Sequence, residues 1–331
     1  MSDATVYDVA KRAKVSIAAV SRVINSPEKV QEGTRERVFS AVDALSFVPR
    51  AEAVARARKT FGQIGVIAPF LVYPSFVQRL RGVSNALANS PYDLVVYNVD
   101  SAPRRDGYLA CLSLTRRLDG LIIMSLPVDD TAAHRLIHHK LETVLIETNR
   151  DMFASIEIDD QAGGRMAAEY LIGKGHRCCA FVGDADLPDY ALHTSDVRLT
   201  GFRQGLEAAG LTLPDEYIGL ASHSMEHARQ QTLRLLDLPK PPTAIFAHSD
   251  NQAMGVLKAA RERNVAIPHE LAVIGFDDIE MADYIGLTTI RQPLEESGRL
   301  AVEMLLARLA DSTRSIHHVR LPLTFIQRET A

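Results

Sequence analysis

The sequence predicts an α/β protein with a small three-helix head at the N-terminus and a larger body of two doubly wound lobes. The first 48 residues contain three short amphipathic helical patterns, and the rest of the chain alternates apolar runs with helical stretches. The length of 331 residues fits two or three domains of roughly 100 to 200 residues each. We therefore expect a head at 1–48, a linker at 49–60 and a two-lobed core at 61–331.

The composition is that of an ordinary globular protein, with 47% hydrophobic and 24% charged residues and a mean hydropathy of -0.02. The longest apolar runs fall well short of the roughly 18 residues of a membrane span. The N-terminus is polar and charged from its third residue, so it lacks the apolar core of a secretory signal. We expect a cytoplasmic protein, associated with the nucleoid. Its three cysteines, Cys111, Cys178 and Cys179, do not predict a disulfide framework.

Charge is unevenly distributed along the chain. Residues 1–59 carry 11 Lys and Arg against 7 Asp and Glu, whereas residues 60–331 carry 26 against 34. A basic module joined to an acidic body indicates that the head could meet a polyanion. A surplus of this size more often belongs to a merely solvated charged surface.

The first two helical patterns follow closely on each other. Thr5 is placed to cap a helix whose apolar spacing continues to Ala13, with Asp8 three residues after the cap. Ser16 is placed to cap a second helix that turns Val20 and Val23 inward.

A third pattern completes a compact helix-turn-helix. After a loop with Ser26, Pro27 and Gly33, we expect Thr34 to cap a helix with apolar spacing up to Leu45. The second helix of such a motif enters the major groove of DNA, so its outer residues should contact base edges. The alternative is a three-helix bundle with a merely solvated basic surface.

The run TVYDVAKRAKVSIAAVSRVIN, from Thr5 to Asn25, resembles the head of the LacI/GalR family of bacterial transcriptional regulators. The resemblance implies that Ile17 and Ala18 select the operator, where apolar side chains favour a thymine methyl group, and that Arg22 contacts guanine. The DNA-binding residues expected from the head are Thr5, Ser16, Ile17, Ala18, Ser21, Arg22 and Asn25.

The linker departs from the family pattern. Members of the family form a hinge helix here that enters the minor groove, and this chain keeps Pro49 and Ala53. Arg50 replaces the usual Asn, and Arg56 replaces the usual apolar wedge. An arginine favours a narrow, electronegative minor groove, whereas a leucine kinks a base step. We expect Arg50, Ala53 and Arg56 to contact DNA; the alternative is a flexible basic tether.

The body begins with QIGVIAPF and a helix over 75–89, continues with YDLVVYNVD and a helix over 104–117, and then with DGLIIMSL, a helix over 131–140 and TVLIETN. The same order restarts with CCAFVGDA, IGLAS, TAIFAHSD and LAVIGFDD, with helices that begin near Ser195, Met225 and Asn251. This alternation predicts two parallel sheets. Ligands of such sheets lie beyond the carboxyl ends of the strands. Polar residues stand there at Glu147, Ser249, Asp250, Asp277 and Asp278.

Four segments of the body resemble the same family and the periplasmic sugar-binding proteins whose fold its core shares. They are IGVIAP, VRLTGFRQGL, PPTAIFAHSDNQAMGVL and LAVIGFDDIEMADYIGLTTIRQP. The resemblance implies a periplasmic-binding-protein-like core, with one lobe at about 61–160 and 292–322 and the other at about 161–291 and 323–331.

The family binds its effector between the lobes, which implies Arg198 and Asp277 as polar anchors and Tyr73 and Phe76 on the other lobe. An arginine and a carboxylate suit the hydroxyls of a neutral polyol, although an amino sugar, a purine or a sugar phosphate could use the same residues. Alternatively, Asp277 with Asp278 caps the following helix, and Arg198 forms a surface ion pair with a neighbouring carboxylate. The expected effector-binding residues are Tyr73, Phe76, Glu147, Arg198, His223, Ser249 and Asp277.

One string invites an enzymatic reading, because His223, Glu226 and His227 spell the HxxEH of zinc hydrolases. However, Ser222 and Ser224 indicate that a helix only begins here. The sequence has no GxSxG elbow, no phosphate loop and no CxxC pair. We expect no catalytic residue, no metal and no cofactor.

These features together predict a homodimeric repressor of carbohydrate-utilisation genes that binds a pseudo-palindromic operator and is controlled by a sugar or sugar derivative between the lobes. The alternatives are a purine- or nucleoside-responsive regulator and a ligand-binding module without operator specificity.

Overall fold

The computed structural model describes residues 5–25, 30–45, 47, 61–115, 117–185, 188–222 and 224–331. Contacts divide the chain near residue 63 into a helical head and a core, and each is described by itself. Among the described residues, no helix is both long and apolar enough to span a membrane.

The head consists of α1 (Val6–Ala13), α2 (Ile17–Asn25) and α3 (Glu32–Leu45). Thr5 and Asp8 form the predicted capping box of α1, and Ser16 Oγ accepts a hydrogen bond from the backbone N of Ala19 at the start of α2. Lys14 ends α1 in the left-handed conformation, with φ 55°. The core of the head is formed by Val9, Ala10, Ala13, Val20, Val23, Val38 and Ala41.

The predicted start of the third helix is wrong. The helix begins at Glu32, so Gly33 and Thr34 lie inside its first turn and Thr34 is not its cap. The backbone N atoms of Thr34 and Arg35 both donate to the carbonyl of Gln31, which therefore marks the true helix start.

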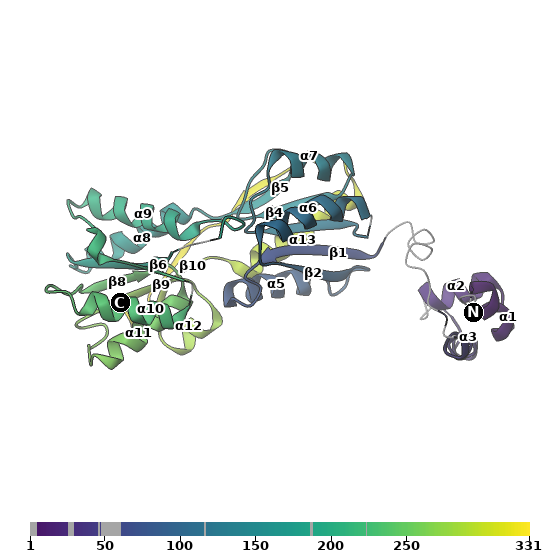
Figure 1. Ribbon diagram of the computed structural model, residues 1–331, viewed down its shortest axis with the longest axis horizontal. Coiled ribbons are helices and arrows are strands. Elements are labelled where there is room, and N and C mark those ends of the chain that lie inside the picture. The colour runs from purple at the N-terminus through teal and green to yellow at the C-terminus, as the bar shows by residue number, and fades with distance from the viewer. Residues whose placement is uncertain are drawn as a thin grey trace. The chain divides into compact units, whose positions relative to one another are not determined.

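The first lobe of the core, the N-lobe, has a six-stranded sheet in the order β11-β5-β4-β3-β1-β2 (Figure 1). The pairs β1–β3, β3–β4, β4–β5 and β5–β11 are parallel. The strands are β1 (Gln63–Pro69), β2 (Asp93–Val99), β3 (Gly120–Met124), β4 (Glu142–Ile146), β5 (Ala154–Glu157) and β11 (His318–Arg320). Its helices are α5 (Pro74–Leu87), α6 (Ala102–Thr115), α7 (Asp130–His138) and α13 (Leu294–Ala310). Helix α5 packs against α13, and α6 packs against α7.

The second lobe, the C-lobe, has a six-stranded sheet in the order β12-β10-β9-β8-β6-β7, in which only the edge pair β10–β12 is antiparallel among the described pairs. The strands are β6 (Cys179–Asp184), β7 (Ile218–Ala221), β8 (Ala244–Ala247), β9 (Ala272–Asp277), β10 (Thr288–Arg291) and β12 (Thr324–Ile326). Its helices are α8 (Asp160–Gly173), α9 (Thr194–Ala208), α10 (Met225–Leu236), α11 (Asp250–Glu262) and the short α12 (Glu280–Tyr284).

The predicted alternation of strands and helices is confirmed, and two sheets of mainly parallel strands result. The prediction missed β5, β10, β11 and β12, which are three or four residues long, and it left α8 and α13 unnamed. The missed segments connect the lobes: the chain passes from one sheet to the other between β5 and α8, between β10 and α13, and between β11 and β12.

Candidate functional site

A cavity of about 230 Å³ lies inside the core between the two lobes. This space accepts several water-sized groups and therefore suits a small ligand. Its walls come from both lobes and from Gln292, just after β10. The lining residues are Phe70, Tyr73, Ser75, Phe76, Ser125, Glu147, Asp184, Ala185, Pro188, Leu192, Thr194, Arg198, Ser222, His248, Ser249, Asp277 and Gln292.

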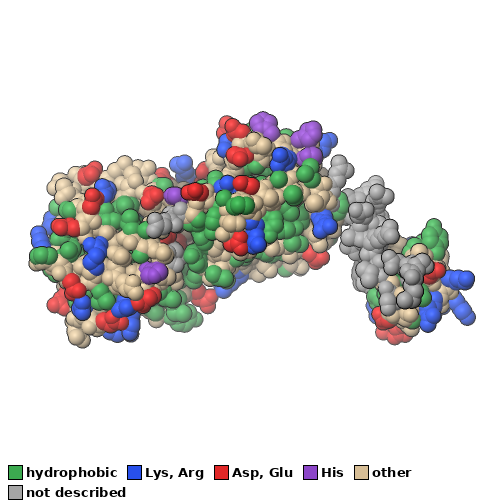
Figure 2. Space-filling model, in the orientation of Figure 1, with side chains coloured by type: hydrophobic (Ala, Val, Ile, Leu, Met, Phe, Trp, Pro, Cys, Tyr) green, Lys and Arg blue, Asp and Glu red, His purple; other side chains and the backbone are tan. Residues whose placement is uncertain are grey.

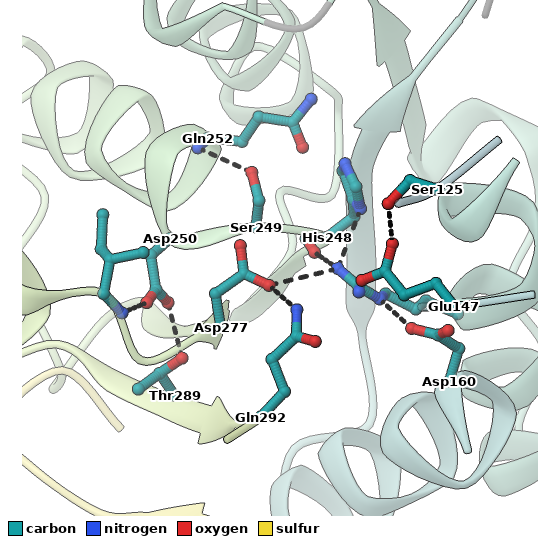
Figure 3. Close-up of polar contacts among 12 residues, drawn as sticks. Ser125, Glu147, Asp160, His248, Ser249, Asp250, Gln252, Asp277, Thr289 and Gln292 are labelled. Atoms are coloured by element: carbon teal, nitrogen blue, oxygen red, sulfur yellow. Dashed lines mark hydrogen bonds and ion pairs between the residues drawn. The ribbon is translucent and has the colours of Figure 1, made fainter. Parts of the chain in front are cut away.

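Arg198 on α9 is the central cation of the cavity, although only 3% of its surface is exposed. Its Nε donates to Asp160 Oδ1 at 2.7 Å, its Nη1 donates to the carbonyl of His248 at 2.7 Å, and Nη1 lies 3.8 Å from Asp277 Oδ1 (Figure 3). The guanidinium also lies 3.6 Å from the centre of the Phe276 ring. Burial disfavours its charge, but Asp160 and Asp277 outweigh burial and raise its pKa.

Asp277, at the end of β9, is the second carboxylate beside this cation, farther from it than Asp160. Its Oδ1 accepts from Gln292 Nε2 at 2.5 Å. Burial raises the pKa of Asp277 to about 6, only partly offset by Arg198 and Gln292. The group is therefore mostly ionised at neutral pH and can accept a hydrogen bond from a ligand hydroxyl.

A second buried arginine, Arg79 on α5, belongs to the N-lobe. Its Nη2 donates to Glu147 Oε1 at 2.5 Å and to Gln292 Oε1 at 3.3 Å, and its Nε donates to Ser297 Oγ at 3.1 Å. Ser125 donates to the other oxygen of Glu147. Burial opposes the charge of Glu147, but Arg79 and Ser125 together hold its pKa below the ordinary value. Glu147 is therefore an ionised residue of the cavity wall, and its cation, Arg79, lies behind the wall.

A third cluster centres on Asp184 at the end of β6. His248 Nε2 lies 2.8 Å from Asp184 Oδ2, and Gln252 Nε2 donates to Oδ1 at 2.6 Å. The other ring nitrogen of His248, Nδ1, lies 3.4 Å from Arg198 Nη1. A contact to the carboxylate on one nitrogen and to a guanidinium donor on the other fits a neutral ring protonated on Nε2. The cluster therefore links Asp184 to Arg198.

Aromatic rings form an apolar part of the cavity wall. Phe70 and Tyr73 stack with their centres 5.1 Å apart and their planes 5° apart, and Phe76 meets Phe70 edge-on at 6.1 Å. Such rings offer a flat surface to the carbon skeleton of a ligand.

Four cavity residues occupy the left-handed region of backbone conformation at or just after the end of a strand. They are Phe70, Ser125, Glu147 and Asp277, with φ values of 52°, 52°, 66° and 111°. Positive φ is costly for residues other than glycine and occurs most often at functional sites. Here it turns each side chain into the cavity as the strand ends.

Six of the seven expected effector residues line this one cavity, and His223 lies outside the described residues. Two of the alternatives are wrong: Arg198 is buried rather than on the surface, and α12 has Ile279 as its N-cap, so Asp277 does not cap it. Ser249 lines the cavity, but its Oγ also caps α11 by accepting from the backbone N of Gln252.

Asp250 is a structural residue rather than part of the cavity wall. It is completely buried, and its two oxygens accept from the backbone N of Ile279 at 2.8 Å and from Thr289 Oγ1 at 2.5 Å (Figure 3). Burial beside Asp277 raises the pKa of Asp250 well above its ordinary range.

Prediction from sequence overlooked Ser125, Asp184, His248 and Gln292. The first three could have been found from their place, because Asp184 ends β6 and His248 and Ser125 directly follow β8 and β3. Gln292 follows β10, which was itself missed.

In the head, Ile17, Ala18 and Arg22 are exposed on α2, with Ile17 42% exposed. Thr5 and Ser16 are also exposed, at the starts of α1 and α2, and Ser21 is half-buried. Figure 2 shows basic side chains gathered over α1, where Lys11, Arg12 and Lys14 are exposed. Arg50, Ala53, Arg56 and the side chain of Asn25 lie outside the described residues.

The HxxEH segment, which resembles a zinc-binding motif, has another role in the structure. Helix α10 begins at Met225 after its cap Ser224, as expected. Glu226 is exposed and bonded to Arg229 and Gln230, which lower its pKa to about 2 and leave it a poor general base. No group of three or more metal-ligating side chains occurs among the described residues.

Two family models match the chain. "Bacterial regulatory proteins, lacI family" matches residues 5–50, and "Periplasmic binding protein-like domain" matches residues 168–331.

Curated relatives match over nearly the whole length. Catabolite control protein A of Priestia megaterium is 30% identical over 322 residues, which is 96% of each chain. The HTH-type transcriptional repressor CytR of Escherichia coli K12 is 31% identical over 311 residues, which is 92% of this chain and 90% of the relative.

Solved structures share the fold. The transcriptional regulator CelR–cellobiose complex has a TM-score of 0.71 at 26% identity and covers 99% of this chain and 100% of its own. A LacI family transcriptional regulator from Enterococcus faecium with bound ribose has a TM-score of 0.72 at 28% identity and covers 81% of this chain and 98% of its own.

A helix-turn-helix head followed by a two-lobed core with a ligand-sized cavity defines a DNA-binding transcriptional regulator with an effector site. The chain belongs to the lacI family of bacterial regulatory proteins.

Proposed function

We propose that this chain is a homodimeric, cytoplasmic repressor of carbohydrate-utilisation genes, whose operator affinity is controlled by a sugar or sugar derivative in the cavity of the core. The observation that carries the proposal is the buried pair Arg198 and Asp277, which faces the stacked rings of Phe70 and Tyr73 across one cavity. Donor, acceptor and flat apolar surface are the three elements by which a protein holds a polyol. The cellobiose and ribose complexes of similar proteins support the same ligand class.

The division of labour follows the chain. Residues 1–48 read DNA, 49–60 transmit the state of the core, and 61–331 bind the effector and dimerise. In the head, Ile17, Ala18, Ser21 and Arg22 contact base edges, while Thr5, Ser16 and Asn25 position the head. Arg50, Ala53 and Arg56 contact the minor groove. Effector binding changes operator affinity because the liganded and free cores differ in free energy on DNA.

The protein performs no catalysis in this proposal. Its buried carboxylates are each bonded to a cation, a hydroxyl or an amide, as expected of groups that bind and orient a ligand.

Two-fold symmetry of the dimer matches two half-sites of a pseudo-palindromic operator.

The test is selection of the full chain against random DNA duplexes at two salt concentrations. An enriched inverted repeat of about 14 to 20 base pairs, with affinity that falls steeply as salt rises, is expected. Retention of DNA duplexes without sequence preference would contradict recognition of a specific operator. If no DNA were retained, ligand binding by the core would be the only function left in the proposal.

A further inference from the structure

Among the described residues of the core, two guanidiniums are buried, and both are already paired with carboxylates. Arg79 binds Glu147 at 2.5 Å, and Arg198 binds Asp160 at 2.7 Å and lies 3.8 Å from Asp277. An arginine that is to hold a phosphate needs positive charge that carboxylates of the protein do not already compensate. In this cavity, carboxylates of the protein itself already compensate the positive charge of both arginines.

The charges around the cavity sum to a negative value. Among the described residues, the wall contains the three carboxylates of Glu147, Asp184 and Asp277 and one guanidinium, Arg198. Directly behind the wall lie Arg79 and Asp160, one of each sign. Carboxylates therefore outnumber cations by two, and they still exceed them by one if His248 is counted as protonated.

Asp184 supplies one of the two excess negative charges around the cavity. It is 5% exposed, and both of its oxygens are held, by His248 at 2.8 Å and by Gln252 at 2.6 Å. Its backbone N donates to Ser195 Oγ at 3.0 Å. A carboxylate fixed at this many points cannot swing out of the cavity when a ligand enters.

Helix ends offset only a part of this charge. Helices α5, α9 and α11 begin beside the cavity, and a helix N-terminus carries roughly half a positive charge. Asp196 and Asp250 stand in the first turns of α9 and α11. Among these three, only α5 lacks an acidic residue in its first turn.

We propose that the effector carries no negative charge, and that Asp184, fixed by His248 and Gln252, is the residue that excludes phosphorylated and carboxylated analogues. This inference rests on the proposed function. It narrows the class of effector from sugars and sugar derivatives in general to those that are uncharged or cationic. Like charges brought together in a buried site cost several kcal/mol, which corresponds to more than about a hundredfold in affinity.

The first test needs no knowledge of the effector. A small-molecule extract of the source bacterium is separated on an anion exchanger, and the unretained and retained fractions are each added to the full chain during thermal unfolding. Ligand binding to the folded state raises Tm. The unretained fraction should raise Tm, whereas a rise only with the retained fraction would overturn the inference and keep the proposed effector function. No rise with either fraction would remove the effector function itself.

The second test assigns the selectivity to Asp184. In Asp184→Asn, which keeps the size of the side chain, the response to the retained fraction should approach the response to the unretained one, with the gap in effective affinity reduced at least about tenfold. Asp189→Asn is the matched control, because Asp189 is exposed in the same segment and its carbonyl, which the substitution keeps, accepts from Arg105. A folded Asp184→Asn protein with the selectivity of wild type would contradict the role of Asp184.

Discussion

The two lobes repeat one helical arrangement around their buried arginines. In the N-lobe, Arg79 and Gly82 lie on α5, and a Cβ built on Gly82 would lie 2.0 Å from the carbonyl oxygen of Glu295 on α13. In the C-lobe, Arg198 and Gly201 have the same spacing along α9 as Arg79 and Gly82 have along α5.

A Cβ built on Gly201 would lie 1.9 Å from the carbonyl oxygen of Gln161 on α8. The contact is reciprocal in both lobes: a Cβ on Gly298 would lie 2.1 Å from Arg79 O, and one on Gly164 would lie 2.0 Å from Arg198 O. Glycines thus let each arginine-bearing helix approach its partner closely.

The arginines themselves differ in use. Arg79 binds Glu147, Ser297 and Gln292 and does not line the cavity, whereas Arg198 does. The N-lobe supplies an aromatic wall and one compensated carboxylate, and the C-lobe supplies the cation, Asp184 and Asp277. The same scaffold therefore carries an ion pair behind the cavity wall in one lobe and an ion pair that lines the cavity in the other.

The largest expected effect comes from removing the C-lobe arginine. Arg198→Met leaves Asp160 and Asp277 buried without their cation, so we expect a loss of about 3–5 kcal/mol in the free energy of unfolding. Urea denaturation followed by far-ultraviolet circular dichroism measures it. The control Arg203→Met removes an exposed ion pair with Asp215 from the same helix and should change stability little.

The same substitution in the N-lobe sharpens the comparison. Arg79→Met should be similarly destabilising, because it leaves Glu147 without its cation. Conservative Arg79→Lys should retain effector binding, whereas Arg198→Lys should weaken it, because of the two arginines only Arg198 lines the cavity. Equal losses of effector affinity in the two lysine variants would break the proposed distinction.

Steric substitutions test the repeated helix contact. Gly82→Ala and Gly201→Ala both place a methyl group against a backbone carbonyl, so each should cost about 1–3 kcal/mol by forcing the helices apart. Gly107→Ala on α6 is the control, since nothing lies within 4 Å of its added Cβ, and it should stabilise the protein by about 0.5–1 kcal/mol. Tolerance of alanine at Gly82 or Gly201 would refute the close approach.

The lobes should also differ in the sign of their pH dependence. The pKa of Asp277 is raised from 3.8 to about 6, so the folded state holds its proton more tightly, and the stability from this group is present at low pH and lost as pH rises through 6. The pKa of Glu147 is lowered from 4.5, so its contribution is present above that value and lost as pH falls.

Unfolding of wild type, Asp277→Asn and Glu147→Gln between about pH 3 and 7 measures both contributions, because the Glu147 contribution changes below 4.5 and the Asp277 contribution between 3.8 and about 6. Relative to wild type, Asp277→Asn should gain stability as pH rises, and Glu147→Gln should lose it. If the stability of both variants relative to wild type changed with pH in the same direction, the pKa values of Asp277 and Glu147 would not be shifted in opposite directions.

The smallest expected effect concerns a surface contact between the lobes. Arg81 on α5 binds Glu280 of the C-lobe and Glu295 of its own lobe, each at 3.2 Å. Glu280→Gln should change effector affinity by less than about threefold, because exposed pairs contribute little. Calorimetric titration with the active extract fraction, with Glu295→Gln as the control within one lobe, measures the difference. A larger change in Glu280→Gln would mean that this pair holds the lobes together.

Much of the fold was predictable because long apolar strands and capped helices leave a clear periodic signal, as at Thr5 and Ser16. β5 and β11 were not recognised as strands, because such short segments leave a weak periodic signal and their partners are set by tertiary contacts. Thr34 misled the prediction of α3, since a residue that often caps a helix is also tolerated in its first turn.

The site was predictable where residues end a long strand, as for Glu147 and Asp277. The pairing of Asp184 with His248 was not, because those residues are 64 positions apart and meet only when β6 and β8 lie side by side. Nor did the sequence show that Arg79 is compensated while Arg198 faces the cavity.

The coupling of the cavity to DNA is tested most directly by operator affinity in the presence of ligand. Fluorescence anisotropy of the selected operator, with and without a saturating amount of the active fraction, is measured for the full chain and for Asp277→Asn. We predict a change of at least about fivefold in the operator Kd of the wild type and none in the variant, which should still bind DNA without ligand. An operator Kd that stays the same while the fraction raises the Tm of the wild type would contradict control of DNA binding from this cavity.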